Sequence, residues 1–537
     1  MSISKMKKLV VIAPTESADA VIAKLMSLRC VDIREFSSDD TDNLIKKVNY
    51  DEQIAQAQEN IQKIESVISS LYKYSNKKSR LSNKRACVDR CAFLESGDYD
   101  AVIDLVWKEY DLIAQLDEAN ENKEVYDNLV NEIKSVSYDL NKIEALYDIE
   151  MTNLLTLRAK EKTSVSESCT FIHGWVPKKA QEKVEEALSE YVCAFEFEEP
   201  TEDDEPPVSL SNNPITRAFE WLVSGIVCPK YRSFDPTFIT SIFYFLAFGL
   251  MLPDIGYGAI LVLFGLLGAK LFGLRGRIKE VFNMLGWCGF SSMIFGVLLG
   301  SWFGDIPYAI MQNILGIEKA SEVFPLFGGV WFNHLQKPVY YLVVTLALGA
   351  IQILVGMILK FVLLCKEGKA VDALLDIAPW WVIFAGIALA FTVNLPVGLI
   401  VIGVGVLAVL LFAGRAKATL SAKIKGGLLG LCKIGLYAID LLGFLKIFVL
   451  GVSVAMITHW INMLATIMGA STIGYVIFVA VCIVCHGICF CIGSFVAFLI
   501  ANSLQRNEFF KQFLIDGGDR FAPVSVMEKY TIDSCKK

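Results

Sequence analysis

Eight long apolar segments in the second half of the chain constrain its fold more than any other feature of the sequence. A transmembrane helix needs about 20 predominantly apolar residues. On this basis we predict spans at 238–251, 255–272, 281–302, 339–364, 374–393, 397–413, 433–465 and 473–503. The predicted fold of residues 235–515 is therefore a polytopic α-helical membrane domain of about eight transmembrane helices.

The two halves of the chain also differ in charge. Of 50 Lys and Arg and 57 Asp and Glu, residues 1–210 hold 26 and 41, which leaves 24 and 16 for the remainder. The chain thus divides into an acidic, soluble half and a basic, apolar half. No short apolar run with a small-residue cleavage site opens the sequence, so we expect the first half to stay in the cytoplasm.

The distribution of positive charge predicts the orientation of the membrane domain. Cytoplasmic loops carry an excess of Lys and Arg. Connections on one side are rich in these residues, namely Lys270, Arg275, Arg277, Lys279, Lys366, Lys369, Arg415, Lys417, Lys423 and Lys425. Connections on the other side are poor in them, at 253–254, 304–337, 394–396 and 469–472. Both ends of the chain are therefore predicted to be cytoplasmic.

The last two apolar segments are too long for a straight crossing. At about 1.5 Å per residue, a helix over 433–465 would measure roughly 50 Å, against a hydrocarbon core of about 30 Å. We therefore expect these two helices to be strongly tilted or to extend into the cytoplasm.

The same two helices hold most of the polar side chains at membrane depth. One carries Asp440, Lys446, Thr458, His459 and Asn462, and the other carries His486, Asn502, Ser503, Gln505, Arg506 and Glu508. Hydrogen bonds between helices can account for the presence of hydroxyl and amide side chains at this depth. A cation at this depth costs roughly 3 kcal/mol on insertion scales, so Lys446 requires a partner or a function. Snorkelling of its side chain to the interface is the alternative.

The soluble half opens and closes with similar units. A strand at 6–12, a helix at 17–27 and a strand at 30–36 are predicted first. The same order recurs at 170–175, 178–189 and 192–197. We interpret the two units as two small α/β lobes.

Two helical segments with apolar residues at heptad spacing lie between these lobes. The outgoing segment carries Ile54, Ala57, Ile61, Ile64, Ile68 and Leu71, and the returning one Leu129, Ile133, Val136, Leu140 and Ile143. The pattern predicts a cytoplasmic α/β plus antiparallel coiled-coil arm over 1–200. An acidic, Pro-bearing linker at 201–234 leads to the membrane domain, and 516–537 form a cytoplasmic tail.

No catalytic motif occurs in the sequence. There is no G-x-x-x-x-G-K-[ST] phosphate loop, because Gly368-Lys369 is followed by Ala and lacks the upstream Gly. Cys482, Cys485 and Cys489 share one face of a helix, but free Cys is also a small apolar residue suited to a membrane helix. We predict no enzyme site, metal, cofactor or nucleic-acid partner in this chain.

Several motifs resemble those of one family. Residues 204–267 are similar to the start of the membrane domain of subunit a of V-type ATPases, called subunit I in the prokaryotic enzymes. The matching motifs are Pro206-Pro207 to Asn213, Asp235-Pro236-Thr237 and Pro253 to Gly258. Further similarities are 295–305 (FGVLLGSWFGD), 348–359 (LGAIQILVGMIL), and Glu508 to Phe513 with Asp516 to Gly518 and Phe521 to Pro523.

The resemblance implies a stator subunit without catalysis, in an H⁺- or Na⁺-transporting two-sector rotary ATPase or ATP synthase of the prokaryotic inner membrane. In this family the arm holds peripheral stalks of E and G/H-type subunits. The last two tilted helices face a proteolipid c/K rotor ring, with two ion half-channels between them. The further implied partners are the V1/A1 catalytic sector, a central-stalk d/C-type subunit and membrane lipid.

Two positions depart from the family pattern. The family motif Y-L-R-L-x-A-L-G is similar to Phe444 to Gly451 (FLKIFVLG), which places Lys446 at the essential Arg. A second family Arg falls on Ser503, one turn before Arg506. Buried Lys loses its proton more readily than Arg, so a nearby carboxylate is needed to keep it charged. The resemblance implies ion translocation by Lys446, Asp440, Asn502, Ser503, Gln505, Arg506, Glu508 and His486.

Two other functions stay open. The first is a stand-alone transporter or channel, which would show an inverted repeat with broken helices at matching positions. The second is a structural paralogue of subunit a that assembles without translocating ions. The departures at Lys446 and Ser503 keep this second alternative open.

Overall fold

The computed structural model describes residues 3–35, 47–74, 85–95, 98–118, 123–136, 140–201, 203–226, 228–274, 276–313, 316–317, 329–415, 417–467, 472–514 and 517–533. Phe36, Arg275, residues 469–471 and Asp516, which the sequence predictions include, lie outside the described residues. The chain forms two compact units. The membrane unit comprises Asn212–Leu271 and Arg275–Gly517, and the N-terminal unit comprises Ser2–Ser211, Phe272–Leu274 and Gly518–Lys537. The boundary at 211 and 212 falls within the predicted linker.

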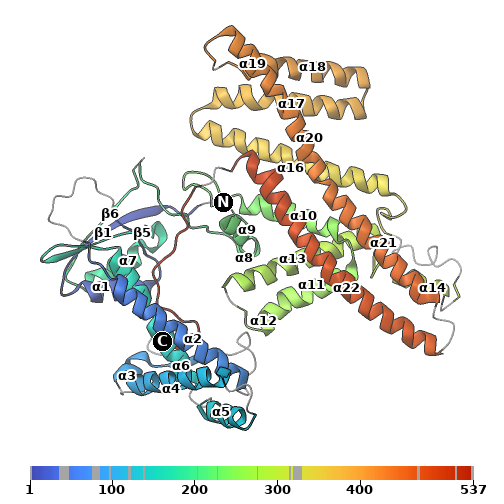
Figure 1. Ribbon diagram of the computed structural model, residues 1–537. Coiled ribbons are helices and arrows are strands. Elements are labelled where there is room, and N and C mark those ends of the chain that lie inside the picture. Colours follow the sequence, from blue (N-terminus) through green and yellow to red (C-terminus); the bar gives the residue numbers. More distant parts are fainter. Residues whose placement is uncertain are drawn as a thin grey trace. The chain divides into compact units, whose positions relative to one another are not determined.

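An antiparallel sheet forms the first part of the N-terminal unit (Figure 1). Its strands are β1 (Met6–Pro14), β2 (Asp32–Ile33), β4 (Ser164–Val165), β5 (Cys169–Pro177) and β6 (Ala194–Glu198). The helices of this part are α1 (Ala18–Leu28), the 3-10 turn η3 (Lys178–Ala180) and α7 (Gln181–Ser189). The strand order is β2-β5-β1-β6, and β4 pairs with β5 outside this path. Apolar side chains of β1 and β5 form one core with those of α1 and α7.

The prediction of two separate α/β lobes is wrong. Both β2 and β1 pair antiparallel with β5, while β6 pairs antiparallel with β1. Each predicted β-α-β unit is therefore split, and its gap is filled by a strand of the other unit. A sheet of only two strands could not bury the apolar face of its helix, whereas the interleaved sheet covers both helices.

The second part of the N-terminal unit is a helical bundle. It contains α2 (Asp51–Tyr74), α3 (Arg90–Glu95), α4 (Asp98–Glu118), α5 (Lys123–Val136) and α6 (Leu140–Glu161). Helix α2 packs against α4, α5 and α6, so the predicted two-helix coiled coil is too simple. Val67 is fully buried beside the predicted heptad positions and widens the apolar stripe of α2. A stripe of this width needs more than one partner helix.

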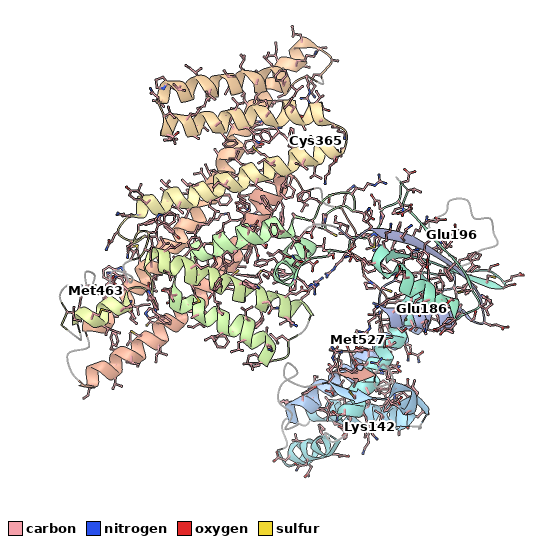
Figure 2. The ribbon with its side chains drawn as sticks, turned by 180° about the vertical axis from the view of Figure 1, so that it is seen from behind. Lys142, Glu186, Glu196, Cys365, Met463 and Met527 are labelled. Carbon is pink, nitrogen blue, oxygen red and sulfur yellow. The ribbon has the colours of Figure 1, made fainter. Side chains whose placement is uncertain are left out.

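The C-terminal segment packs onto the N-terminal unit. Strand β7 (Thr531–Asp533) pairs in parallel with β3 (Ala86–Val88), and Val524 N donates to Val31 O at 2.9 Å. Figure 2 marks Met527 in this segment, whose amide donates to Thr152 Oγ1 at 3.1 Å. The predicted tail is thus a folded part of this unit as far as residue 533.

Helices make up the membrane unit. They are α8 (Pro214–Arg217), α9 (Glu220–Ile226), α10 (Thr237–Met251), α11 (Ile255–Val262), a π-helix (Leu263–Gly268), α12 (Ala269–Leu271), α13 (Gly276–Leu299), α14 (Ile306–Asn313), α16 (Pro338–Lys366), α17 (Ala370–Thr392), α18 (Leu395–Phe412), α19 (Leu420–Leu431), α20 (Lys433–Gly443), α21 (Leu445–Ile467) and α22 (Thr472–Leu504). A second π-helix (Gln505–Phe509) and a 3-10 turn (Phe510–Gln512) follow α22.

Six stretches in the described residues are long and apolar enough to cross a membrane. They are Gly276–Leu299, Pro338–Lys366, Ala370–Thr392, Leu395–Phe412, Leu420–Leu464 and Val476–Gln512. The first two predicted spans are shorter apolar helices, Thr237–Met251 and Ile255–Leu271. All eight predicted segments are therefore helical, and the chain is a polytopic helical membrane protein. The count of eight spans stays a prediction.

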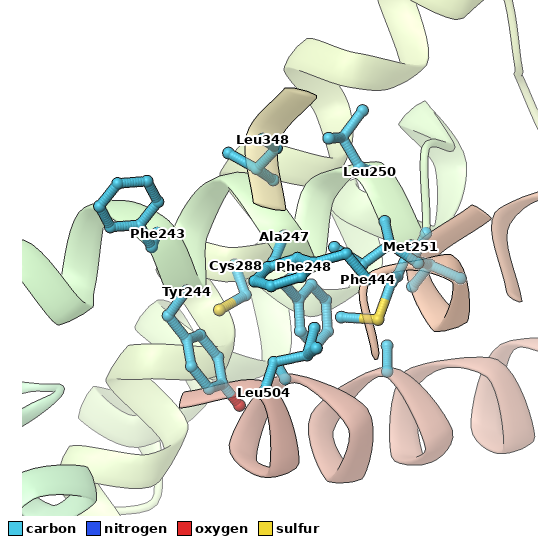
Figure 3. Packing of buried hydrophobic residues seen from close by; sticks show 14 of the residues in the cluster. Phe243, Tyr244, Ala247, Phe248, Leu250, Met251, Cys288, Leu348, Phe444 and Leu504 are labelled. Atoms are coloured by element: carbon cyan, nitrogen blue, oxygen red, sulfur yellow. The ribbon is translucent and has the colours of Figure 1, made fainter. Parts of the chain in front are cut away.

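Helix α10 lies at the centre of the membrane unit. It contacts α13, α16, α21 and α22. Figure 3 shows part of this core, where Phe444 and Leu504 from the last helices lie near Phe248 and Met251 of α10. The four side chains are fully buried, so the last helices are held against a rigid apolar support.

Candidate functional site

An ion pair joins the two segments predicted to carry function. Lys446 Nζ, near the start of α21, lies 3.3 Å from Glu508 Oε1 in the π-helix after α22. The Lys446 side chain is 44% exposed, whereas that of Glu508 is 8% exposed. The Glu508 carboxylate therefore lies inside the protein, whereas the side chain of its partner Lys446 is partly exposed.

Irregular backbone positions both members of this pair. The helix over 433–465 is interrupted at Phe444, between α20 and α21, with Ile447 N donating to Phe444 O at 3.0 Å. Phe444 itself is buried, and a Cβ on Gly349 of α16 would overlap its ring. On the other side, residues 505–509 form a π-helix, a form of helix that occurs frequently at functional sites.

A second ion pair lies next to the first. Asp440 of α20 is buried, forms an ion pair with Lys511, and accepts a hydrogen bond from Gln512 Nε2 at 2.9 Å. Asp440, Lys446, Glu508 and Lys511 together form a charged cluster of two cations and two carboxylates. Because charges inside an apolar region are costly unless they are paired, this balance stabilises the cluster.

Buried amides border the charged cluster. Gln352 Nε2 of α16 donates to Gln505 Oε1 at 2.9 Å, and both side chains are almost fully buried. Within the described residues, Asn502 Oδ1, Gln505 Nε2 and Glu508 Oε2 are buried atoms without a hydrogen-bond partner. Buried polar atoms of this kind are suited to bind water or an ion.

Ser503 and Arg506 make only local contacts among the described residues. Ser503 Oγ accepts a hydrogen bond from Asn507 Nδ2 at 3.1 Å, and Arg506 Nε donates to Asn507 Oδ1 at 3.4 Å. Arg506 is exposed. It therefore adds positive charge beside the charged cluster without a direct bond to Lys446 or Glu508.

His486 belongs to a different polar group on the same two helices. Its Nδ1 lies 2.8 Å from Tyr257 Oη on α11, and its Nε2 lies 2.9 Å from Asn462 Oδ1 on α21. Both His486 and Asn462 are buried. Of the eight residues that the sequence predicts to take part in ion translocation, His486 therefore lies apart from the other seven.

The chain of contacts continues to a loop after α13. Asn462 Nδ2 donates to Asp305 Oδ1 at 2.8 Å, and His459 Nδ1 lies 2.5 Å from Asp305 Oδ2. Tyr257, Asp305, His459, Asn462 and His486 form the polar network. His459 and Asp305 are partly exposed, so one end of the network is accessible from outside the protein. Figure 2 marks Met463, the residue after Asn462.

Asp254 fixes the turn that supports the polar network. Its carboxylate caps α11 through Tyr257 N at 3.0 Å and accepts from Ser301 Oγ, Phe303 N and Gly304 N at 2.6 to 3.1 Å. Gly304 adopts a φ of +70°, which glycine tolerates without strain. The motifs at 253–258 and 295–305 are thus held together by one buried carboxylate.

The charged cluster lies at the start of α21 and just after the end of α22, whereas the polar network lies near the end of α21 and at the middle of α22. Lys446 and Asn462 are 16 residues apart on α21, which corresponds to about 24 Å at 1.5 Å per residue. The intervening helix surfaces are mostly apolar. The arrangement provides two separate polar sites and a barrier between them.

Sequence reasoning missed several members of these groups as site residues. Tyr257, Asp305 and Gln352 lie outside the last two helices, although all three occur in the motifs on which the resemblance rests. His459 and Asn462 were identified as polar residues at membrane depth but not as a site. Within the described residues no group of three or more His, Cys, Asp and Glu side chains is arranged to hold a metal ion.

Comparisons with known proteins agree with the motifs. Residues 48–285 match the V-type ATPase 116kDa subunit family. The A-type ATP synthase subunit I of Methanocaldococcus jannaschii is 27% identical over 431 residues, which cover 75% of this chain and 62% of that protein. That of Thermococcus kodakarensis is 31% identical over 254 residues, 45% of this chain and 36% of that protein.

A bacterial relative shows the same likeness. The V-type ATP synthase subunit I of Borreliella burgdorferi is 24% identical over 303 residues, 55% of this chain and 48% of that protein. The chain spans less than two thirds of the length of each of these three relatives.

Fold and site together define a class, that of multi-pass membrane proteins with charged groups on the last two helices and a folded N-terminal unit. The matches to this family model and to the subunit I proteins confirm the resemblance drawn from the motifs.

Proposed function

We propose that this chain is the membrane stator subunit of a rotary V/A-type ATPase or ATP synthase, and that it carries ions past a rotor ring. The observation that carries the proposal is the Lys446–Glu508 pair, a fixed carboxylate with a half-exposed ammonium on the outer surface of α21. The relatives named subunit I of ATP synthases support it.

The exposed ammonium is suited to receive a second carboxylate. A rotor carboxylate that approaches Lys446 within about 4 Å would compete with Glu508 for the ammonium. The rotor group would then be held as a carboxylate and would release its ion. Because Glu508 stays behind as a fixed partner, Lys446 is kept charged between successive rotor groups.

The polar network and the charged cluster are proposed as the two half-channels. Unpartnered oxygen and nitrogen atoms of Asn502, Gln505 and Glu508 support a hydrated path at one end. The partly exposed Asp305 and His459 support a second path at the other end. The offset of about 24 Å along α21 prevents a direct leak between them.

The assembly and orientation are further parts of the proposal. The excess of Lys and Arg in alternate loops supports a chain with both ends in the cytoplasm of a prokaryotic cell. The N-terminal unit would then hold peripheral stalks of E and G/H-type subunits and contact the V1/A1 sector and a d/C-type subunit. The membrane unit would face the proteolipid c/K ring.

A structural paralogue without ion transport is the second candidate. It is favoured by Ser503, which lacks the positive charge that the family pattern has there, and by the pairing of Lys446 with Glu508. In that case the ion pair would serve only to join α21 to the segment after α22.

Ion transport by the assembled complex in vesicles separates the two candidates. We expect Lys446→Ala to abolish ATP-driven ion uptake and Lys446→Arg to retain at least a tenth of it, with intact assembly in both. A Lys417→Ala variant, in an exposed loop, controls for the loss of a positive charge. Undiminished uptake by Lys446→Ala would exclude the proposed role of this residue.

A further inference from the structure

A cavity of about 220 Å³ lies in the membrane unit, and neither Lys446 nor Glu508 lines it. It is enclosed by α16, α17, α18, α19 and α20, which contact one another at one end of the unit (Figure 1). The volume is several times the roughly 30 Å³ that one water molecule occupies in the liquid. The cavity therefore has room for a polar headgroup.

Two lysine side chains line this cavity. Lys360 comes from α16 and Lys433 from the start of α20. Among the described residues neither ammonium has a carboxylate within 4.0 Å, although other lysines of the membrane unit, such as Lys446 and Lys511, have one. Two unpaired ammoniums that face one cavity repel each other, so an anion between them would be stabilised.

The carboxylate that lines the cavity is already occupied. Of the described lining residues only Asp376 carries a carboxylate, and it forms an ion pair with Arg415. Arg415 also binds Asp372 at 2.6 Å. A guanidinium held by two carboxylates leaves Asp376 little capacity to neutralise the lysines, and the cavity keeps an excess of positive charge.

Most residues that line the cavity in α16, α17 and α18 lie toward one end of their helix, where a membrane boundary is expected. Lys360 lies six residues before the end of α16, which is about 9 Å, and Lys433 is the first residue of α20. Trp380 and Tyr437 line the cavity with ring centroids 4.9 Å apart. Amphipathic aromatic rings of this kind are enriched at the level of lipid headgroups.

Apolar side chains close in sequence to the lining residues Gly430, Lys433 and Tyr437 are exposed. Leu428 and Leu429 of α19 and Leu436 of α20 are each more than half exposed. Their surface would cover hydrocarbon chains, whereas a small free anion would leave it unused. The ligand chemistry that fits is thus an anionic headgroup joined to acyl chains.

We propose that this cavity binds the phosphate headgroup of an anionic phospholipid, held between the Lys360 and Lys433 ammoniums with its acyl chains on the exposed leucines. Basic cavities between transmembrane helices are a known mode of headgroup recognition. Gln512 also lines the cavity, and its Nε2 donates to Asp440 Oδ2 at 2.9 Å. A bound lipid would therefore stabilise the packing of the charged cluster.

Native mass spectrometry of the purified full-length chain in neutral detergent tests this site. We expect phosphatidylglycerol to bind at least tenfold more tightly than phosphatidylcholine. A Lys360→Gln/Lys433→Gln variant should lose this preference, while the matched Lys417→Gln/Lys425→Gln variant, which changes two exposed lysines outside the cavity, should keep it.

Three results would overturn the lipid site. They are equal binding of the two lipids, an equal loss in the control variant, and displacement of phosphatidylglycerol by millimolar inorganic phosphate, which would indicate a free-phosphate site. If the double variant does not fold, photoactivatable phosphatidylglycerol decides on the unaltered chain. Labelling of peptides that contain 360 and 433 supports the site, and labelling elsewhere alone excludes it. No readout involves ion transport, so this test is independent of the proposed function.

Discussion

Gly443 leaves the space that the carboxylate of Glu508 occupies, because a Cβ built on this glycine would overlap Glu508 Oε1. Oε1 is the same atom that binds Lys446. Gly443 ends α20 directly before the interruption at Phe444, so the site depends on a residue that carries no chemistry of its own.

Gly443→Ala should therefore separate Glu508 from Lys446 without removing either charge. We expect at least a tenfold decrease in ATP-driven ion transport by the assembled complex in vesicles, and a loss of roughly 1–3 kcal/mol of stability from the overlap. The matched control is Gly435→Ala on the same helix, where a Cβ would meet nothing within 4 Å. Equal transport by the two variants would show that the ion pair is not needed for function.

Lys446 and Glu508 could be chosen as candidate site residues from the sequence, but their pairing could not be predicted. Each is a charged residue beside long apolar stretches, which makes it a candidate for function. The two residues are 62 positions apart, and their contact depends on the interruption at Phe444 and on the π-helix over 505–509. Neither irregularity has a local sequence pattern that distinguishes it from regular helix.

In the sheet of the N-terminal unit, too, contacts between residues far apart in the sequence could not be predicted. Both β-α-β units were predictable from alternation and helical periodicity. The order of elements along the chain is identical for two lobes and for one interleaved sheet, and only the pairing of β1 with β5 decides between them. That pairing joins residues about 160 positions apart and depends on burial of both helices.

Asn462 connects the two histidines of the polar network, and its loss should affect both. Asn462→Leu keeps the approximate volume but removes the hydrogen bonds to His486 and the Phe303 carbonyl, and it leaves the Asp305 carboxylate with His459 alone among the described residues. Unsatisfied buried groups cost about 1–3 kcal/mol each. We expect a lower thermal unfolding temperature and a decrease in transport. Met456→Leu, a change at an exposed site on α21, should alter neither.

A second substitution of Asn462 distinguishes a structural role of this residue from a role in ion transport. Asn462→Asp retains the acceptor toward His486 and places a second carboxylate beside Asp305. If the polar network carries ions, the pH dependence of transport should shift in Asn462→Asp. An unchanged pH profile would assign Asn462 to packing only.

The carboxylate of Asp148 holds the C-terminal segment to the N-terminal unit. It accepts hydrogen bonds from the amides of Lys529, Tyr530 and Thr531 and from Thr531 Oγ1, at 2.7 to 3.0 Å for the shortest contact of each. Asp148→Ala should release the segment, with amide hydrogen exchange at 527–533 faster by at least tenfold. Asp19→Ala, which removes an exposed carboxylate paired with Lys160, should leave that exchange unchanged. Full protection in Asp148→Ala would mean that the pairing of β3 and β7 suffices.

His173 makes the stability of the sheet depend on pH. It lies on β5 opposite Val10. Burial and the nearby positive charge of Lys8 lower the pKa of His173, and the negative charge of Glu198 offsets part of this decrease. In the unfolded chain the imidazole takes up a proton as the pH falls below about 6.5, while the folded state resists it until a lower pH. Stability is thus complete above pH 6.5 and decreases below it, by at most about 1.4 kcal/mol per pH unit.

Amide hydrogen exchange of the full chain, corrected for the intrinsic effect of pH, measures this dependence on the β5 peptide 169–177. Protection should decrease between pH 7 and pH 5, and His173→Gln should flatten the dependence because glutamine does not titrate. Lys8→Gln should flatten it in part, since it removes the positive charge that lowers the pKa of His173. A steep dependence that persists in His173→Gln would assign the effect to another group, and His173 would then be only a packing residue of the strand.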